Sequence, residues 1–168
     1  MLQEVWEWVR SIIIAIILAL LFRMFLVEHF LVDGQSMYPT LQDNERIIVN
    51  KLVYRLQEPE YGEIIVFEYQ DNRDFIKRVV GEEGDKIKID DNQLYVNSNR
   101  VEEPYIKKNS VEDYGPVTVP EDHYFVLGDN RANSRDSRYD DVGHVSMEEI
   151  KGRAAVVFWP LDRARFIE

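Results

Sequence analysis

The stretch "EIIVFEYQDNRDFIKRVVG", residues 63–81, indicates how most of this chain folds. Two short runs rich in β-branched and aromatic residues, 63–69 and 74–80, are separated by polar residues of the kind found in turns. Runs of this length and composition are typical of β-strands. We therefore expect strands on both sides of the polar residues.

The same pattern recurs along the rest of the chain. Further apolar runs bounded by turn residues are found at 46–54, 86–89, 94–96, 123–129 and 153–159. The runs at 86–89 and 94–96 flank an Asp-Asp-Asn turn signal, so we expect them to form a hairpin. Together these runs predict an all-β fold, a compact antiparallel β-barrel-like or sandwich domain covering residues 30–168.

Two segments depart from the strand pattern. Ser146 followed by Glu149 is typical of a capping box and predicts a helical turn at 146–151. Residues 100–118 are polar and weakly patterned, and we interpret them as a loop or excursion.

Composition narrows the class of protein. The chain has 168 residues, enough for one domain plus an appendage. Its formal net charge of −11 argues against a nucleic-acid partner, which usually requires a basic face. It has no cysteine, which excludes disulfides, thiolate metal sites and a cysteine nucleophile.

The N-terminal segment "SIIIAIILALLF", residues 11–22, is almost entirely aliphatic. From Ser11 to Val27 a helix would rise roughly 25 Å, a little less than a hydrocarbon core of about 30 Å. A cleaved signal peptide would need a basic start and a small-residue cleavage site, and neither is present. A buried soluble helix would show a polar stripe. We therefore predict a short cytoplasmic segment at 1–10 and a single transmembrane helix at 11–29.

Directly after this segment comes "VDGQSMYPTL", residues 32–41. Ser36 lies between Gly34 and Pro39, where the backbone could leave a serine hydroxyl open to a substrate. An ordinary turn serine would give the same composition. A nucleophilic serine also needs a base, and none of the three histidines lies in a triad pattern.

Lys77 is the other candidate base. In a strand, Lys77 shares a face with Phe75 and Val79, while Arg78 shares the opposite face with Ile76. If this strand lies in the core, one cation must be buried, and lysine can lose its proton whereas arginine cannot. Burial lowers the pKa of a lysine and makes it a competent general base. An edge strand, with both cations in solvent, is an equally open alternative.

A polar segment at 126–141, "VLGDNRANSRDSRYDD", follows an apolar strand. It alternates acids, arginines and hydroxyl residues, which could form a lattice of ion pairs and hydrogen bonds. A serine hydroxyl in such a lattice could orient a neutral lysine. A solvated surface loop would have a similar composition.

Four stretches now point to one family. These are "SMYPTL" at 36–41, "YGEIIVF" at 61–67, "KRVVGEEGD" at 77–85 and "GDNRANSRDSR" at 128–138. In this order, and with the N-terminal apolar segment, the chain resembles bacterial type I signal peptidases, in particular the small Gram-positive-type members. The resemblance covers essentially the whole chain.

The resemblance implies a role for each matching residue. Ser36 would be the nucleophile and Lys77 the general base, and Ser134 would donate a hydrogen bond to the lysine amine or accept one from it. Asp136 would hold the site in shape, paired with Arg138 or Arg78. Asp129 belongs to the same supporting lattice. The backbone N–H of Ser36 would be one oxyanion donor, and Gly34 occupies the position that in larger members supplies a second.

The resemblance also implies the substrates and the location. Secreted preproteins would lie along strand edges, and small pockets would accept an Ala-X-Ala-like site. We expect the pocket walls to include Val32, Met37, Phe75 and Ile76. The catalytic domain would lie on the extracytoplasmic side of the cell membrane, the lipid bilayer would be a partner, and no metal or cofactor would be needed.

Two other hypotheses remain open. A self-cleaving repressor could use the same Ser/Lys dyad, but it would need a DNA-binding domain in place of the apolar segment. A non-enzymatic anchored β-domain would explain the apolar segment and the acidity. It would leave the co-occurrence of the motifs unexplained.

Overall fold

The computed structural model describes residues 2–70, 73–106 and 112–167. Within the N-terminal helix, side chains are described from Val5 to Ile17. The chain forms one long helix followed by a domain of antiparallel strands, so the prediction of an all-β domain with one N-terminal helix is confirmed.

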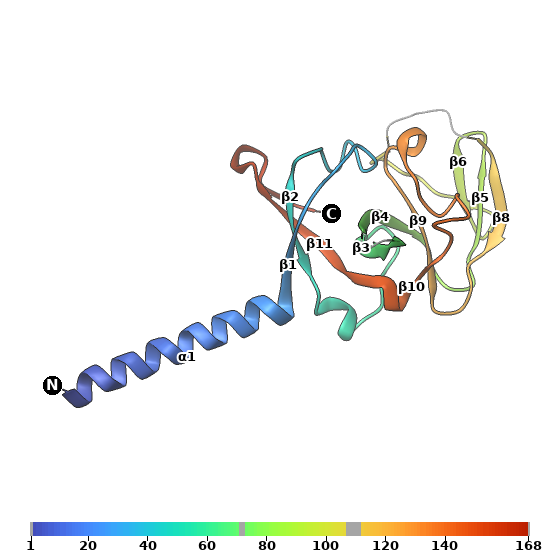
Figure 1. Ribbon diagram of the computed structural model, residues 1–168. Helices are drawn as coiled ribbons and strands as arrows, with labels where there is room; N and C mark the ends of the chain where they lie inside the picture. The colour runs from blue at the N-terminus through green and yellow to red at the C-terminus, as the bar shows by residue number, and fades with distance from the viewer. Residues whose placement is uncertain (1, 71–72, 107–111, 168) are drawn as a thin grey trace.

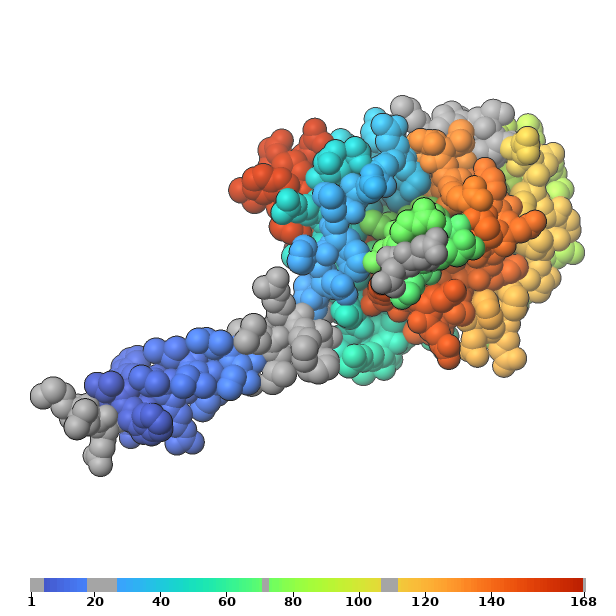
Figure 2. Space-filling view, viewed as in Figure 1, coloured from blue at the N-terminus to red at the C-terminus, as the bar shows by residue number. Residues whose placement is uncertain are grey.

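Helix α1 spans Leu2–Leu26 and projects away from the β domain (Figure 1). Its described aliphatic side chains are not covered by the domain: Ile12, Ile14 and Ile16 are 55%, 45% and 53% exposed. The space-filling view shows this part of the helix clear of the strands (Figure 2). Among the residues included in the search, no helix is both long enough and apolar enough to cross a membrane.

The predicted end of the helix at residue 29 is wrong. Strand β1, Val27–Leu31, begins directly after α1 and pairs antiparallel with β2, Arg46–Asn50. The register places Val27 opposite Asn50 and Leu31 opposite Arg46. Pairing with β2 satisfies the backbone of residues 27–31, and this tertiary contact overrides the apolar run that extends into them.

The larger sheet holds the two strands that were most evident in the sequence. Its order is β1-β2-β11-β3-β4-β9-β10, with β12 also paired to β11. β3 is Ile64–Tyr69 and β4 is Arg73–Gly81. The remaining strands are β9, His123–Leu127, β10, Val145–Ser146, β11, Ile150–Trp159, and β12, Arg165–Phe166. β4 therefore lies in the interior of the sheet, between β3 and β9.

The smaller sheet has the order β7-β6-β5-β8. β5, Lys86–Asp90, and β6, Gln93–Val96, form the expected hairpin around Asp91 and Asn92. Both turn residues have positive φ, 47° and 62°, as a two-residue hairpin turn that follows strand twist requires. β7 is Asn99–Arg100 and β8 is Tyr114–Thr118.

Strand β8 lies in the segment interpreted as a loop, and that interpretation is wrong for residues 114–118. β8 pairs with β5 and ends the described sheet. It contains Gly115 and Pro116, residues that weaken a strand signal and that sheets accept mainly at an edge.

Four short 3-10 helices complete the described elements: Val53–Arg55, Arg131–Asn133, Met147–Glu149 and Leu161–Arg163. The third has the predicted capping box, because Glu149 accepts hydrogen bonds from Ser146 N at 2.7 Å and Ser146 Oγ at 3.1 Å.

Three clusters of buried side chains form the core. One packs β2, β3 and β11 against the loop that follows β1, and includes Met37 and Leu41. The second joins β4 and β9 to the smaller sheet through Val80 and Phe125. The third lies around Val79. β4 contributes to the second and third clusters. These clusters can therefore bury a polar side chain on this strand.

Candidate active site

Ser36 lies in the loop between β1 and β2. In Figure 1 this loop is at the end of β1 that points away from helix α1. Two buried side chains, Met37 and Leu41, hold this loop in the core, and Leu41 N donates a hydrogen bond to Met37 O at 2.9 Å. Gly34 has φ +93°, which favours glycine, and its N–H donates to Asp43 Oδ1 at 2.8 Å. The half-buried Ser36 is thus presented on a fixed turn.

Lys77 reaches this serine from β4. Its side chain is only 3% exposed, and Nζ donates hydrogen bonds to Ser36 Oγ and to Ile76 O, both at 2.9 Å. The amine lies 4.8 Å from the centroid of the Phe75 ring. The structure therefore brings together the two residues predicted as nucleophile and base, which are 41 positions apart in the sequence.

Burial lowers the pKa of Lys77 from 10.5 to about 8, although the negative charges of Asp136 and Asp129 favour the ammonium form. Desolvation is the larger effect because the amine is enclosed by β4 and the core. Near neutral pH a tenth or so of such an amine is uncharged. The uncharged amine can accept the proton of the Ser36 hydroxyl across the hydrogen bond already present.

The neighbouring cation, Arg78, is also buried, so the alternative of an edge strand with two solvated cations is wrong. Its guanidinium forms a two-point ion pair with Asp129, with Nε to Oδ1 at 2.9 Å and Nη2 to Oδ2 at 2.8 Å. It also donates to Gly62 O at 2.6 Å, and Thr40 Oγ1 donates to Asp129. The arginine stays charged and is neutralised, whereas the described part of the chain places no carboxylate in an ion pair with the lysine.

The polar loop, residues 128–138, packs directly against the nucleophile turn. Asn130 N donates to Ser36 O and Asn130 Nδ2 donates to Gln35 O, both at 3.0 Å. Gly128 lies at the point of closest approach, because a Cβ added there would be 2.5 Å from Ser36 O. The sequence placed Asn130 in a polar lattice but gave no sign that it would bind the nucleophile's backbone.

Asp136 supports the loop from within. Its carboxylate is fully buried, accepts a hydrogen bond from Gly128 N at 3.0 Å, and pairs with Arg138 through Nε at 2.7 Å and Nη2 at 2.9 Å. Of the two partners considered for Asp136, the structure thus shows Arg138, while Arg78 pairs with Asp129.

Ser134 differs from expectation. Its hydroxyl is buried, but within the described residues it has no hydrogen-bond partner, so the predicted bond to Lys77 is not formed. The two described contacts of Lys77 Nζ are Ser36 Oγ and Ile76 O, and the Ser134 side chain lies instead over Gly128.

The predicted pocket walls fall into two groups. Val32 and Met37 are 4% and 2% exposed and belong to the core beneath the nucleophile turn. Ile76 is partly buried against that same cluster. Phe75 lies in a different cluster and stacks on Tyr69 with a centroid separation of 4.2 Å.

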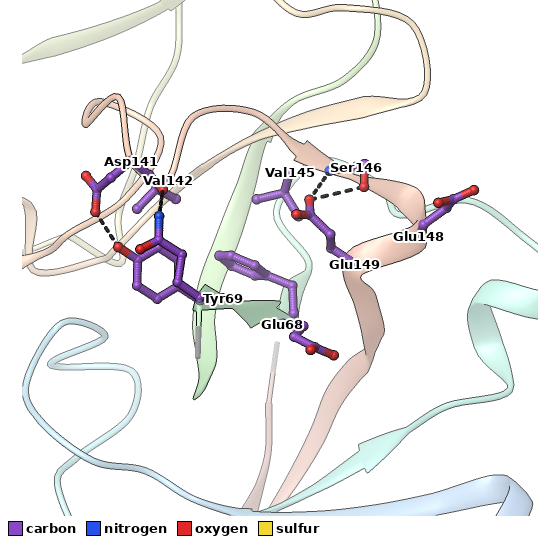
Figure 3. Close-up of a pocket in the computed structure, with 10 residues that line it drawn as sticks. Glu68, Tyr69, Asp141, Val142, Val145, Ser146, Glu148 and Glu149 are labelled. Carbon is purple, nitrogen blue, oxygen red and sulfur yellow. Dashed lines mark hydrogen bonds between the residues drawn. The ribbon is translucent and has the colours of Figure 1, made fainter. Parts of the chain in front are cut away.

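One cavity of the structure is lined by neither this serine nor this lysine. It has a volume of about 680 Å³ and lies between the end of β3 and residues 141–149 (Figure 3). Some of its polar groups bind one another, since Tyr69 donates to Asp141 and Ser146 to Glu149. A search of the described part of the chain for groups of three or more His, Cys, Asp or Glu side chains able to hold a metal ion finds none.

The sequence profile described as "Signal peptidase, peptidase S26" matches residues 5–159. The chain belongs to this family. It is therefore a serine endopeptidase. The resemblance drawn from the four sequence motifs is confirmed, and the hypotheses of a repressor and of a non-enzymatic β-domain are not supported.

Relatives within the signal peptidase family match along most of the chain. Signal peptidase I T of Bacillus subtilis (strain 168) is 42% identical over 170 residues, which are 95% of this chain and 88% of the relative. A probable signal peptidase I-2 of Synechocystis sp. is 43% identical over 169 residues, 96% of this chain and 77% of the relative. A crystal structure of a signal peptidase I from Enterococcus faecalis V583 has a TM-score of 0.51 and 32% identity, and covers 58% of this chain and 97% of that one.

Proposed function

We propose that this chain is a membrane-bound signal peptidase that cuts signal peptides from exported preproteins by means of a Ser36/Lys77 dyad. The observation that carries the proposal is the 2.9 Å contact between Lys77 Nζ and Ser36 Oγ, made by a lysine that burial keeps partly uncharged. Family membership and the names of the relatives support signal peptides as the substrate class.

The first half of the reaction forms an acyl-enzyme. Lys77 Nζ, uncharged, takes the proton from Ser36 Oγ as that oxygen attacks the carbonyl carbon of the scissile peptide bond. The resulting Lys77 ammonium then gives its proton to the departing amine, which leaves as the new N-terminus of the mature protein. The signal peptide remains attached to Ser36 through an ester.

The second half regenerates the enzyme. Lys77, uncharged again, takes a proton from a water molecule that attacks the ester carbonyl. Ser36 Oγ leaves and recovers a proton from the ammonium. In both halves the backbone N–H of Ser36 stabilises the oxyanion, and the Gly34 N–H does not serve as a second donor in this geometry because it is bonded to Asp43.

Substrate recognition would rest on an extended chain added along a strand edge, with small side chains before the cut. The Ala-X-Ala-like preference comes from the family resemblance. Phe75 and Ile76 directly precede Lys77 on β4 and are only partly buried, which supports a role in the pocket walls. Val32 and Met37 would then shape the pocket floor from the core side.

Membrane attachment is proposed for helix α1. Its support is the aliphatic run at 11–22 and the exposure of the isoleucines that the domain leaves uncovered. A bilayer would bury these side chains, with roughly 0.8 kcal/mol for each CH2 group removed from water. The β domain would then lie on the extracytoplasmic side, with Ser36 close to the membrane surface. Extraction of membranes at alkaline pH tests this, since an anchored chain stays with the lipid.

Cleavage of a preprotein by the full chain in detergent tests the proposed chemistry. Replacing either Ser36 or Lys77 by alanine should remove activity to background. Ser146→Ala and Lys151→Ala are matched controls, because both residues lie outside the site and Lys151 pairs with Asp74 instead. Full activity in Ser36→Ala or Lys77→Ala would refute the dyad.

A further inference from the structure

Glu103 carries a buried negative charge outside all four sequence motifs. Its side chain is 3% exposed, and its carboxylate accepts hydrogen bonds from Arg131 Nη1 at 2.9 Å and from Arg131 Nη2 at 2.5 Å. It also accepts a hydrogen bond from Tyr105 Oη at 2.8 Å. The three hydrogen-bond donors stabilise the charge of this buried carboxylate, which would be strongly unfavourable if it were unpaired.

The other side of Arg131 holds the polar loop. Arg131 Nε donates to Gly128 O at 3.1 Å, and Arg138 Nη2 donates to Arg131 O at 2.7 Å. Gly128 is the residue that packs directly on the Ser36 carbonyl, and Asn130 N binds the same carbonyl oxygen. Two residues, Arg131 and then Gly128 or Asn130, therefore connect Glu103 to the backbone of the nucleophile.

A second path starts from the same carboxylate. The Tyr105 ring, held by its hydroxyl on Glu103, lies 3.9 Å from Cζ of Arg78. Arg78 pairs with Asp129 at the start of the polar loop. Glu103 thus acts on two of the arginines that fix this loop, and both paths run from the segment after β7 to the polar loop.

We propose that Glu103 is a positioning residue, which holds the polar loop on Ser36 through Arg131 and through Tyr105 with Arg78. Without its charge, the buried Arg131 guanidinium loses its carboxylate, and the other carboxylate that acts on it electrostatically is Asp136, the residue that binds Gly128 N. Competition for Asp136 would loosen the loop over Ser36 and admit water to Lys77. The charged groups that act on Lys77 in this region are Asp129 and Asp136.

The test compares Glu103→Gln, Glu103→Asp and Glu45→Gln in the full chain. Glu45 is a matched control, because it is a fully buried carboxylate that pairs with Arg165 at 2.8 and 2.9 Å and accepts from Gln42 N. For each variant, the pKa of Lys77 is measured by NMR of isotope-labelled lysine, with a Lys77→Ala sample to assign the signal. Preprotein cleavage gives kcat and KM separately.

Glu103→Gln should lower kcat about 10- to 100-fold with a smaller change in KM, as expected for a displaced reacting group, and should raise the pKa of Lys77 toward its ordinary value. Glu103→Asp, which keeps the charge, should recover most of both properties. Glu45→Gln should leave the pKa of Lys77 unchanged. If Glu103→Gln does not fold, Tyr105→Phe takes its place, because it removes one of the three hydrogen bonds to Glu103 and should change kcat and the pKa of Lys77 in the same directions by smaller amounts. A folded Tyr105→Phe protein with both properties unchanged would then overturn the proposal.

A folded Glu103→Gln protein with the kcat and the Lys77 pKa of the unaltered chain would overturn the proposal. The kinetic part rests on the proposed function. If the unaltered chain cleaves no preprotein, the proposed function is refuted. The effect of Glu103 on the pKa of Lys77 can still be tested in that case, because the NMR measurement needs no substrate.

Discussion

Replacing Lys77 by methionine should change the stability of the protein in a way that depends on pH. Methionine keeps the length and the apolar stem of lysine and removes the charge. In the unaltered protein the pKa of Lys77 is about 8 when folded, against 10.5 as its ordinary value. Below pH 8 the folded protein therefore carries a buried ammonium that the unfolded chain can hydrate.

The size of the effect follows from these two pKa values. A difference of 2.5 pKa units corresponds to about 3 kcal/mol of destabilisation, fully present below pH 8 and lost as the pH rises toward 10.5. Lys77→Met removes this cost, and it also removes the hydrogen bonds to Ser36 and Ile76, worth about 1 kcal/mol each. At pH 7 we expect the variant to be more stable by about 1 kcal/mol.

Urea unfolding of both full-length proteins at pH values from 7 to 10 measures this difference. The other titrating groups are common to the two proteins, so their contributions cancel in the comparison. The stability of the variant relative to the unaltered chain should fall by about 2 to 3 kcal/mol over this range, and its sign should reverse. A difference that stays constant with pH would show that Lys77 has an ordinary pKa and would refute the reasoning.

Three further predictions concern the surroundings of the dyad. Asp129→Asn leaves the Arg78 guanidinium buried without its carboxylate and should cost about 3–5 kcal/mol in urea unfolding; a loss below about 1 kcal/mol would contradict a buried pair. Gly128→Ala places a Cβ 2.2 Å from Ser134 Oγ and 2.5 Å from Ser36 O, so kcat/KM for a preprotein should fall at least about tenfold, and unchanged kinetics would contradict the tight packing. Glu149→Ala removes half of the capping box far from the dyad and should cost about 1 kcal/mol without affecting kcat, so a loss of activity in the folded variant would be against expectation.

Local signals in the sequence made Ser36 and Lys77 candidates, and the family resemblance then joined them as a dyad. Alternation along β4 put Lys77 and Arg78 on opposite faces, and only a lysine can act as a base after burial. The sequence left open whether the strand lies in the core or at an edge, and its place between β3 and β9 shows that it is a core strand.

The partners of the charged groups could not be predicted in the same way. Arg78 pairs with Asp129, 51 positions away, while Asp136 pairs with Arg138 on its own loop. Both acids lie in one segment with several arginines, so pattern alone leaves the pairing open. The unpartnered Ser134 hydroxyl also depends on side-chain placement, which composition does not determine.

The segment at 100–118 shows a different limit of prediction from the sequence. Strand β8 contains a glycine and a proline, which hide its strand character, and Glu103 looks like any surface acid in a polar stretch. Its burial arises from Arg131, 28 positions further on. No periodic pattern marks a contact of this kind, because it depends on how the smaller sheet lies beside the polar loop.

The pH dependence of kcat/KM for preprotein cleavage tests the central claim most directly, since it reports the ionisation of the essential base in the free enzyme. With a Lys77 pKa of about 8, activity should rise about tenfold from pH 6 to pH 7 and level off above pH 8. The rise of kcat/KM with pH should reflect the deprotonation of Lys77, so Lys77→Ala should be inactive at every pH. A plateau already reached near pH 6.5 would indicate a histidine base, and a rise that continues beyond pH 10 would indicate a lysine whose pKa burial has not lowered.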